Sequence, residues 1–101
     1  MNTKTEQTVA RILFNYSIKI STAESCTGGL LSSRLTDVAG SSSYIKENFV
    51  TYANEAKIEL LDVSQETLET YGAVSEQCAK EMAEGLYKKT GCDVAISTTG
   101  I

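Results

Sequence analysis

The amino-acid sequence predicts an α/β fold, a layered α/β sandwich with parallel strand pairs and crossover helices. Two observations lead to this prediction. Short β-branched runs alternate along the chain with segments in which apolar residues recur at helical spacing. The chain also contains seven glycines and no proline, so short glycine-containing turns are expected to connect the elements. Strands separated by helices pair in parallel, and a chain of 101 residues forms one domain, residues 1–101.

The N-terminal third of the chain is predicted to form a helix, a strand and a second helix. The first helix covers residues 4–16, and its packing face is an apolar stripe at positions i, i+3, i+4 and i+7, formed by Val9, Ile12, Leu13 and Tyr16. Alternating β-branched residues predict a strand over 18–24. A polar, glycine-rich loop at 26–29 then leads into a helix that begins at Leu30.

The middle of the chain is predicted to repeat this alternation. Its serine-rich segment 41–43 is typical of a loop, and the apolar and aromatic run at 49–53 predicts a strand. Asn54 is a suitable N-cap for a helix over residues 55–61. The order strand, loop, helix therefore occurs twice.

The C-terminal third is predicted to contain two capped helices and a third strand. Each helix has a serine before it and a glycine after it: Ser64 and Gly72 for the first, Ser75 and Gly91 for the second. Val63 and Leu68 are spaced as a hydrophobic staple around the first cap. The second helix carries an apolar stripe formed by Ala79, Met82, Ala83 and Leu86. The β-branched run 94–98 predicts the strand.

Composition excludes several classes of protein. Without histidine there is no Ser-His-Asp triad, no Cys-His pair and no histidine zinc site, and we predict no metal and no cofactor. A net charge of −4 disfavours binding to nucleic acid. Polar and apolar residues alternate at the start of the chain, so we predict no signal peptide and no membrane anchor, and we expect a cytoplasmic protein. Three cysteines without a CxxC motif fit reduced thiols: Cys26, Cys78 and Cys92.

Three polar loops follow the predicted strands, at residues 24–29, 52–57 and 97–100. In open α/β sheets, ligands bind at the carboxyl ends of the strands, so these loops are the candidates for chemistry. Ser25 lies where a strand turns into a helix, and the backbone N–H groups of residues 26–29 could point at an anion or an oxyanion. A simple strand-to-helix turn with a capping hydroxyl is the alternative.

In the absence of histidine, a lysine with a lowered pKa is the available activator for a serine. Lys57 has a suitable position, in the first turn of the helix that follows the second strand. Tyr52 could relay a proton or orient the lysine. The alternative for Lys57 is a solvated side chain on a helix face. Cys26 is a rival nucleophile because a helix N-terminus favours a thiolate, and its alternative is a small structural cysteine.

Five ordered segments together resemble the CinA C-terminal domain, a family that includes the bacterial nicotinamide mononucleotide deamidases: residues 22–29, 35–42, 50–57, 71–75 and 99–101. The resemblance extends from residue 22 to the end of the chain, and five blocks in order are far more specific than one short motif. It implies a metal-independent amidohydrolase that converts nicotinamide mononucleotide to nicotinate mononucleotide and ammonia in pyridine-nucleotide salvage.

The resemblance also implies roles for individual residues. Ser25 would be the nucleophile, Lys57 its base, and Tyr52 and Ser42 would assist. The residues expected to contact a small-molecule nucleotide substrate are Glu24, Cys26, Thr27, Gly28, Gly29, Ser42, Asn54, Thr99 and Gly100.

The family domain continues beyond the Thr-Gly-Ile sequence at 99–101 with a glycine-rich loop, a strand and further helices, so we expect this domain to be incomplete relative to the family. The exposed sheet edge that would result invites pairing with another chain, and a homo-oligomer is expected. The alternative to an enzyme is a non-catalytic CinA-like module for nucleotide binding or oligomerisation.

Overall fold

A computed structural model of the chain describes residues 3–101. The helices and strands follow one another in the order α1 (Thr3–Asn15), β1 (Ile20–Glu24), α2 (Leu30–Thr36), a 3-10 turn (Ser41–Ser43), β2 (Ile45–Val50), α3 (Asn54–Leu61), α4 (Gln65–Tyr71), α5 (Glu76–Thr90) and β3 (Val94–Thr98). The predicted α/β fold is confirmed. No helix within the described residues is both long and apolar enough to cross a membrane.

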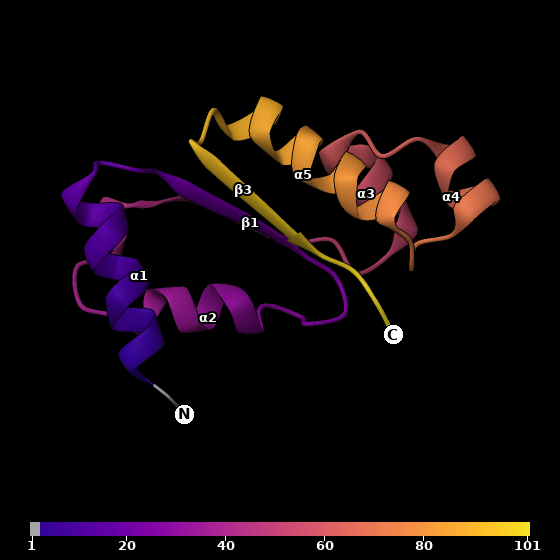
Figure 1. Cartoon of the computed structure of the whole chain (residues 1–101). Helices are drawn as coiled ribbons and strands as arrows, with labels where there is room; N and C mark the ends of the chain where they lie inside the picture. Colours follow the sequence, from indigo (N-terminus) through magenta and orange to yellow (C-terminus); the bar gives the residue numbers. More distant parts are fainter. Residues whose placement is uncertain (1–2) are drawn as a thin grey trace.

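The three strands form one parallel sheet in the order β2-β1-β3. All five residues of the central strand β1 are buried. Figure 1 shows α1 and α2 on one side of the sheet and α3, α4 and α5 on the other. In the register of the sheet, Glu24 lies beside Val50 on β2 and beside Thr98 on β3, so the three strands end together at one edge.

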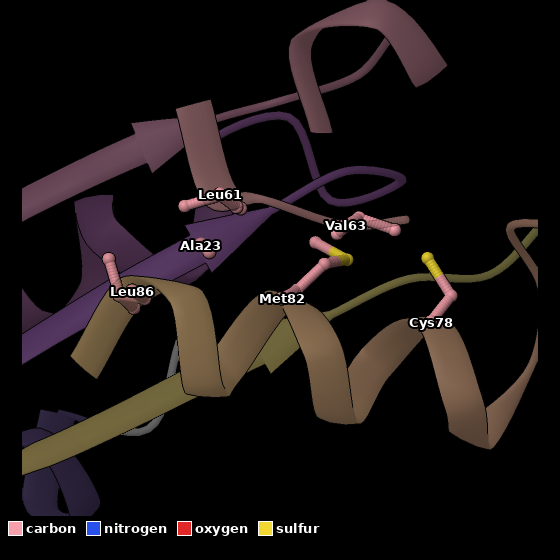
Figure 2. Close-up of a cluster of buried hydrophobic side chains, with 6 residues drawn as sticks. All are labelled: Ala23, Leu61, Val63, Cys78, Met82 and Leu86. Carbon is pink, nitrogen blue, oxygen red and sulfur yellow. The ribbon is translucent and has the colours of Figure 1, made fainter. Parts of the chain in front are cut away.

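The two faces of the sheet are covered by two separate hydrophobic clusters. Beneath α3 and α5 lie the buried side chains that Figure 2 draws: Ala23, Leu61, Val63, Cys78, Met82 and Leu86. Beneath α1 lie Ala10, Leu13, Ile20 and Tyr44. Gly85 lets α5 approach α3 closely, because a Cβ at this position would lie only 1.8 Å from the carbonyl oxygen of Leu61. The chain therefore tolerates no side chain at Gly85.

The predicted helix caps of the C-terminal third are confirmed. The Ser64 hydroxyl accepts the N–H of Thr67 at 3.0 Å, and the Ser75 hydroxyl accepts the N–H of Cys78 at 3.1 Å. Gly72 and Gly91 end these helices as predicted, and β3 covers the predicted residues 94–98. Met82 and Leu86 of the predicted stripe are fully buried, and Ala79 and Ala83 are half-buried.

Other predicted boundaries are wrong. The strand expected at 49–53 is β2, which begins at Ile45 and ends at Val50. It is an edge strand with polar, exposed residues in its first half, and this composition concealed its beginning. Asn54 is not the N-cap of α3, because Ala53 holds that position with extended backbone and no side-chain hydrogen bond.

The packing face predicted for α1 is also partly wrong. Ile12 is 48% exposed and Tyr16, which follows the helix, is 74% exposed. Leu13 is buried and Val9 is half-buried against the same cluster, as predicted, and Glu6 and Ala10 complete the buried face. Glu6 forms an ion pair with Arg34 of α2. The face of α1 that contacts α2 therefore carries a carboxylate.

Candidate active site

The carboxyl edge of the sheet brings the ends of all three strands into hydrogen-bonding contact. The N–H of Ser25, the first residue after β1, donates to the carbonyl oxygen of Thr98 at 3.0 Å. The N–H of Thr51, the first residue after β2, donates to the carbonyl oxygen of Glu24 at 2.8 Å. The three polar loops identified in the sequence therefore meet at one edge, and Ser25 lies at its centre.

Lys57 reaches this edge from the first part of α3. Its Nζ atom lies 3.0 Å from Ser25 Oγ, 2.8 Å from the carbonyl oxygen of Thr51 and 2.9 Å from that of Tyr52. The lysine is only 1% exposed and Ser25 only 6%. The structure thus brings together the two residues that the sequence proposed as nucleophile and base, 32 residues apart in the chain.

The surroundings of Lys57 lower the pKa of its amine. Burial lowers the pKa of its amine below the ordinary lysine value, and the thiols of Cys78 and Cys26 act in the opposite direction without restoring that value. Within the described residues, Lys57 forms no ion pair with a carboxylate. A buried ammonium without a counterion is costly, so Lys57 loses its proton more easily than an exposed lysine does.

The three contacts of Nζ also determine where its lone pair points. Carbonyl oxygens only accept hydrogen bonds, so Thr51 and Tyr52 take two of the amine hydrogens. The remaining position faces Ser25 Oγ. An ammonium donates its third hydrogen to the serine, whereas a neutral amine directs its lone pair there and accepts the serine hydroxyl proton. This arrangement can perform general-base activation of Ser25.

Glu24 was expected to contact substrate, but its side chain binds groups of the following loop and of α2 instead. Its side chain is 0% exposed. The carboxylate accepts hydrogen bonds from the Thr27 hydroxyl at 2.6 Å and from the N–H groups of Gly29, Leu31 and Ser32 at 3.2, 2.9 and 2.8 Å. Burial raises the pKa of Glu24, but these hydrogen bonds outweigh burial and hold its pKa below the usual range. No part of this carboxylate is accessible to a ligand.

The other loop residues lie around Ser25 with different roles. The Thr27 hydroxyl is shared between Glu24 and the Thr98 hydroxyl, which lies 2.8 Å away. Gly28 and Gly29 have positive φ angles of 59° and 108°, a conformation that favours glycine and lets the chain turn into α2. Cys26 is exposed and forms no disulfide.

The remaining predicted contacts are divided between the two edges of the sheet. Gly100 lies beside Cys26, since a Cβ at Gly100 would lie 3.4 Å from its Sγ, and the Thr99 hydroxyl donates to the carbonyl oxygen of Ala73 at 2.8 Å. Asn54 is exposed at the start of α3. Ser42 is misplaced by the prediction: it precedes β2, at the opposite edge where β1 begins, and cannot assist Ser25 within this chain.

Tyr52 contacts Lys57 through its backbone, and a proton-relay role for its phenol stays a prediction. Its carbonyl oxygen orients Lys57, whereas the residue is 73% exposed and its hydroxyl has no hydrogen-bond partner among residues 3–101. Thr51 was not predicted, although its carbonyl oxygen also holds the lysine. A backbone carbonyl has no sequence signature, so the only available signal was the position of Thr51 between the strand and Lys57. Cys78 was likewise missed as a neighbour of Lys57.

The fold and this edge define a class of protein: a parallel α/β domain with a buried serine–lysine pair at the carboxyl ends of its strands. Within the described residues, no group of three or more cysteine, aspartate or glutamate side chains could hold a metal ion. Residues 2–101 match the family model of the CinA C-terminal domain, and the chain belongs to this family.

Relatives in sequence carry the same family name. A CinA-like protein of Chlorobium limicola is 56% identical over 100 residues, which cover 99% of this chain and 23% of that protein. A CinA-like protein of Chloroherpeton thalassium is 56% identical over 96 residues, or 95% of this chain and 23% of that protein. The chain thus spans about a quarter of the length of these curated relatives.

Solved structures share the fold. The competence/damage inducible protein of Agrobacterium tumefaciens has a TM-score of 0.95 at 42% identity, with coverage of 98% of this chain and 60% of that chain. The competence damage-inducible protein A of Klebsiella pneumoniae has a TM-score of 0.91 at 39% identity, with coverage of 94% and 59%. These matches cover about three fifths of the solved chains.

Proposed function

We propose that this chain carries the catalytic centre of a serine–lysine amidohydrolase of the nicotinamide mononucleotide deamidase type, acting in the cytoplasm. The observation that carries the proposal is the 3.0 Å contact between Ser25 Oγ and the Nζ atom of a lysine that is 1% exposed and has a lowered pKa. The resemblance of the sequence to the deamidases supplies the substrate, a nucleotide that bears a carboxamide.

The first half of the reaction forms an acyl-enzyme. Neutral Lys57 accepts the hydroxyl proton while Ser25 Oγ attacks the carboxamide carbon, and the carbonyl π pair moves to oxygen. When this oxyanion collapses, the carbon–nitrogen bond breaks and Lys57 returns the proton to the leaving nitrogen. Ammonia departs, and the acyl group remains on Ser25 as an ester.

The second half consumes one water molecule. Water attacks the ester carbon, Lys57 accepts its proton, and the bond between the carbon and Ser25 Oγ breaks. Lys57 then protonates the serine, and the carboxylic acid product leaves. The same amine thus acts as base and acid in both halves, which requires a pKa close to the working pH.

Ammonia release from nicotinamide mononucleotide tests the proposal. Ser25→Ala should abolish release, since no other residue supplies the attacking oxygen. Ser33→Ala is the matched control, because Ser33 is an exposed serine on α2, and it should act like the wild type. Full activity of Ser25→Ala, or no release by the wild-type chain, contradicts the proposal. Loss in Cys26→Ser with retention in Ser25→Ala assigns the nucleophile to Cys26.

A non-catalytic nucleotide-binding or oligomerisation module is the second candidate. The observation that favours it is the outer edge of β3, which has no partner strand within residues 3–101. Two residues of β3 itself, Val94 and Ile96, also have exposed side chains. An unpaired strand edge can pair with a second copy of the chain. Size-exclusion chromatography, together with nucleotide binding measured without turnover, distinguishes this candidate from the enzyme.

A further inference from the structure

We propose that Glu24 is a positioning residue for the Ser25–Lys57 pair. Its carboxylate holds the Ser25 loop in the one conformation that leaves two backbone N–H groups, those of Cys26 and Thr27, free for an oxyanion. This inference rests on the proposed function and assigns Glu24 a role that differs from the substrate contact expected from the sequence.

The carboxylate of Glu24 ties together two consecutive parts of the chain. It accepts hydrogen bonds from Thr27 and Gly29 in the loop and from Leu31 and Ser32 in the first turn of α2. The residue is 0% exposed, and no cation pairs with it among the described residues. A buried carboxylate of this kind is stable only while its donors stay in place, so it opposes every movement of the loop.

The main chain of Glu24 connects this loop to the lysine. Its carbonyl oxygen accepts the N–H of Thr51 at 2.8 Å, and the carbonyl oxygen of Thr51 in turn accepts a hydrogen from Lys57 at 2.8 Å. Ser25 follows Glu24 directly. One residue therefore fixes the backbone that presents the nucleophile and the backbone that holds the base.

The same hydrogen bonds decide which amides remain available. Between residues 25 and 33, the amides that donate within the fold are those of Ser25, Gly28, Gly29, Leu30, Leu31, Ser32 and Ser33. Only the N–H groups of Cys26 and Thr27 have no acceptor in this segment. They follow the nucleophile directly, where amides can stabilise the oxyanion formed from the substrate carbonyl.

The test compares Glu24→Gln with Glu81→Gln. Glutamine keeps the size of glutamate, but an NH₂ group in place of Oε2 would face the N–H of Ser32, which Oε2 now accepts. The neutral amide oxygen in place of Oε1 is also a weaker acceptor for the hydroxyl of Thr27 and the N–H groups of Gly29 and Leu31. Glu81 is a matched control, because its carboxylate accepts the N–H of Ser64 at 2.8 Å and the hydroxyl of Thr67 at the start of α4, away from Ser25. Both variants lose hydrogen bonds to a carboxylate, so a general loss of stability affects both.

For ammonia release, we expect Glu24→Gln to lower kcat about 100-fold with KM nearly unchanged, since misplacement of a catalytic group costs rate rather than substrate affinity. Glu81→Gln should leave both constants near the wild-type values. Wild-type kcat in Glu24→Gln, or an equal loss of kcat in Glu81→Gln, overturns the inference.

Two readouts separate this inference from the proposed function. Phenylmethylsulfonyl fluoride should sulfonylate Ser25 Oγ: the oxygen–sulfur bond forms, the sulfur–fluorine bond breaks with loss of fluoride, and Lys57 accepts the hydroxyl proton. This reaction should be slower in Glu24→Gln. By NMR, the amides of Gly29, Leu31 and Ser32 should exchange roughly tenfold faster in that variant. If the wild-type chain neither releases ammonia nor reacts at Ser25, the proposed function fails and amide exchange alone decides: unchanged exchange overturns the role of Glu24, and faster exchange supports it.

Discussion

At the scale of single residues, Lys57 shows how burial can prepare an amine for proton transfer. The side chain occupies a site that water barely reaches, and two carbonyl oxygens and one hydroxyl satisfy it without a countercharge. The cost of burying a charge is then expressed as a lower pKa. Two measurements follow from this environment, one of rate and one of stability.

The rate of carboxamide hydrolysis should rise with pH as Lys57 loses its proton, with a midpoint below the ordinary lysine pKa of 10.5. The pH profile of kcat/KM measures this directly. Lys57→Arg should remove activity at every pH, because a guanidinium keeps its proton. A wild-type rate that does not change with pH would contradict the assignment of Lys57 as the base.

The lowered pKa of Lys57 should also make the free energy of unfolding depend on pH, in a direction that can be derived. Because folding lowers the pKa of Lys57, the unfolded chain binds more protons between the folded pKa and 10.5, and the free energy of unfolding rises with pH in that window. Urea unfolding of the wild type and Lys57→Met across alkaline pH measures the effect. The stability of the wild type relative to Lys57→Met should increase as pH rises, and a decrease would contradict the lowered pKa.

Ser25 and Lys57 could be proposed from the sequence because their residue types limit the available chemistry. Their 3.0 Å separation could not, since it depends on the pairing of β1 with β2. The role of Glu24 was hidden for a related reason. A glutamate at the end of a strand has the same sequence signature whether it faces a ligand or the N–H groups of its own loop.

At the scale of elements, the contact between α3 and α5 depends on one missing side chain. The Cβ of an alanine at Gly85 would lie 1.8 Å from the Leu61 carbonyl oxygen, an atom that cannot move without shifting the end of α3. We expect Gly85→Ala to lower the free energy of unfolding by about 3 kcal/mol or more, or to prevent folding.

Gly91→Ala provides the control for Gly85→Ala. Gly91 has a φ of 68°, and a Cβ there would meet no atom within 4 Å, so its substitution should cost only about 1 kcal/mol of backbone strain. Urea denaturation followed by circular dichroism measures both variants. Equal losses in the two variants would show that helix contact is not the cause.

The elements that could be predicted are those whose signals are local. The caps at Ser64 and Ser75 bond to amides three residues away, so sequence spacing alone identifies them. β2 depends on its neighbour β1 for all its pairing, and its polar first half has no strand signature of its own. The face of α1 was mispredicted because the Glu6–Arg34 ion pair joins two helices that sequence periodicity treats separately.

At the scale of the whole molecule, the two hydrophobic clusters lie on opposite faces of one sheet and meet at β1, which contributes Ala23 to one and Ile20 to the other. Loss of either cluster should therefore unfold both. Leu13→Ala, in the cluster beneath α1, should lower the free energy of unfolding by about 2–5 kcal/mol. In this variant, the circular dichroism of the whole chain and the NMR signals of α1 and α5 should still all change at one urea concentration.

Phe14→Ala is the control for Leu13→Ala. Phe14 is the neighbouring residue of α1 but is 66% exposed, so its substitution should change stability by less than about 0.5 kcal/mol. Separate transitions for α1 and α5 in Leu13→Ala would show that the two faces of the sheet fold independently.

The order β2-β1-β3 has one more consequence for the place where Ser25 and Lys57 meet. After β1 the chain turns to the face that carries α2, and after β2 it turns to the opposite face, where α3 lies (Figure 1). The two connections diverge from neighbouring strand ends, which makes this a topological switch point, the position at which open α/β sheets bind their ligands. The winding of the chain thus selects the position, and the residues of the two diverging loops determine which chemistry is possible there.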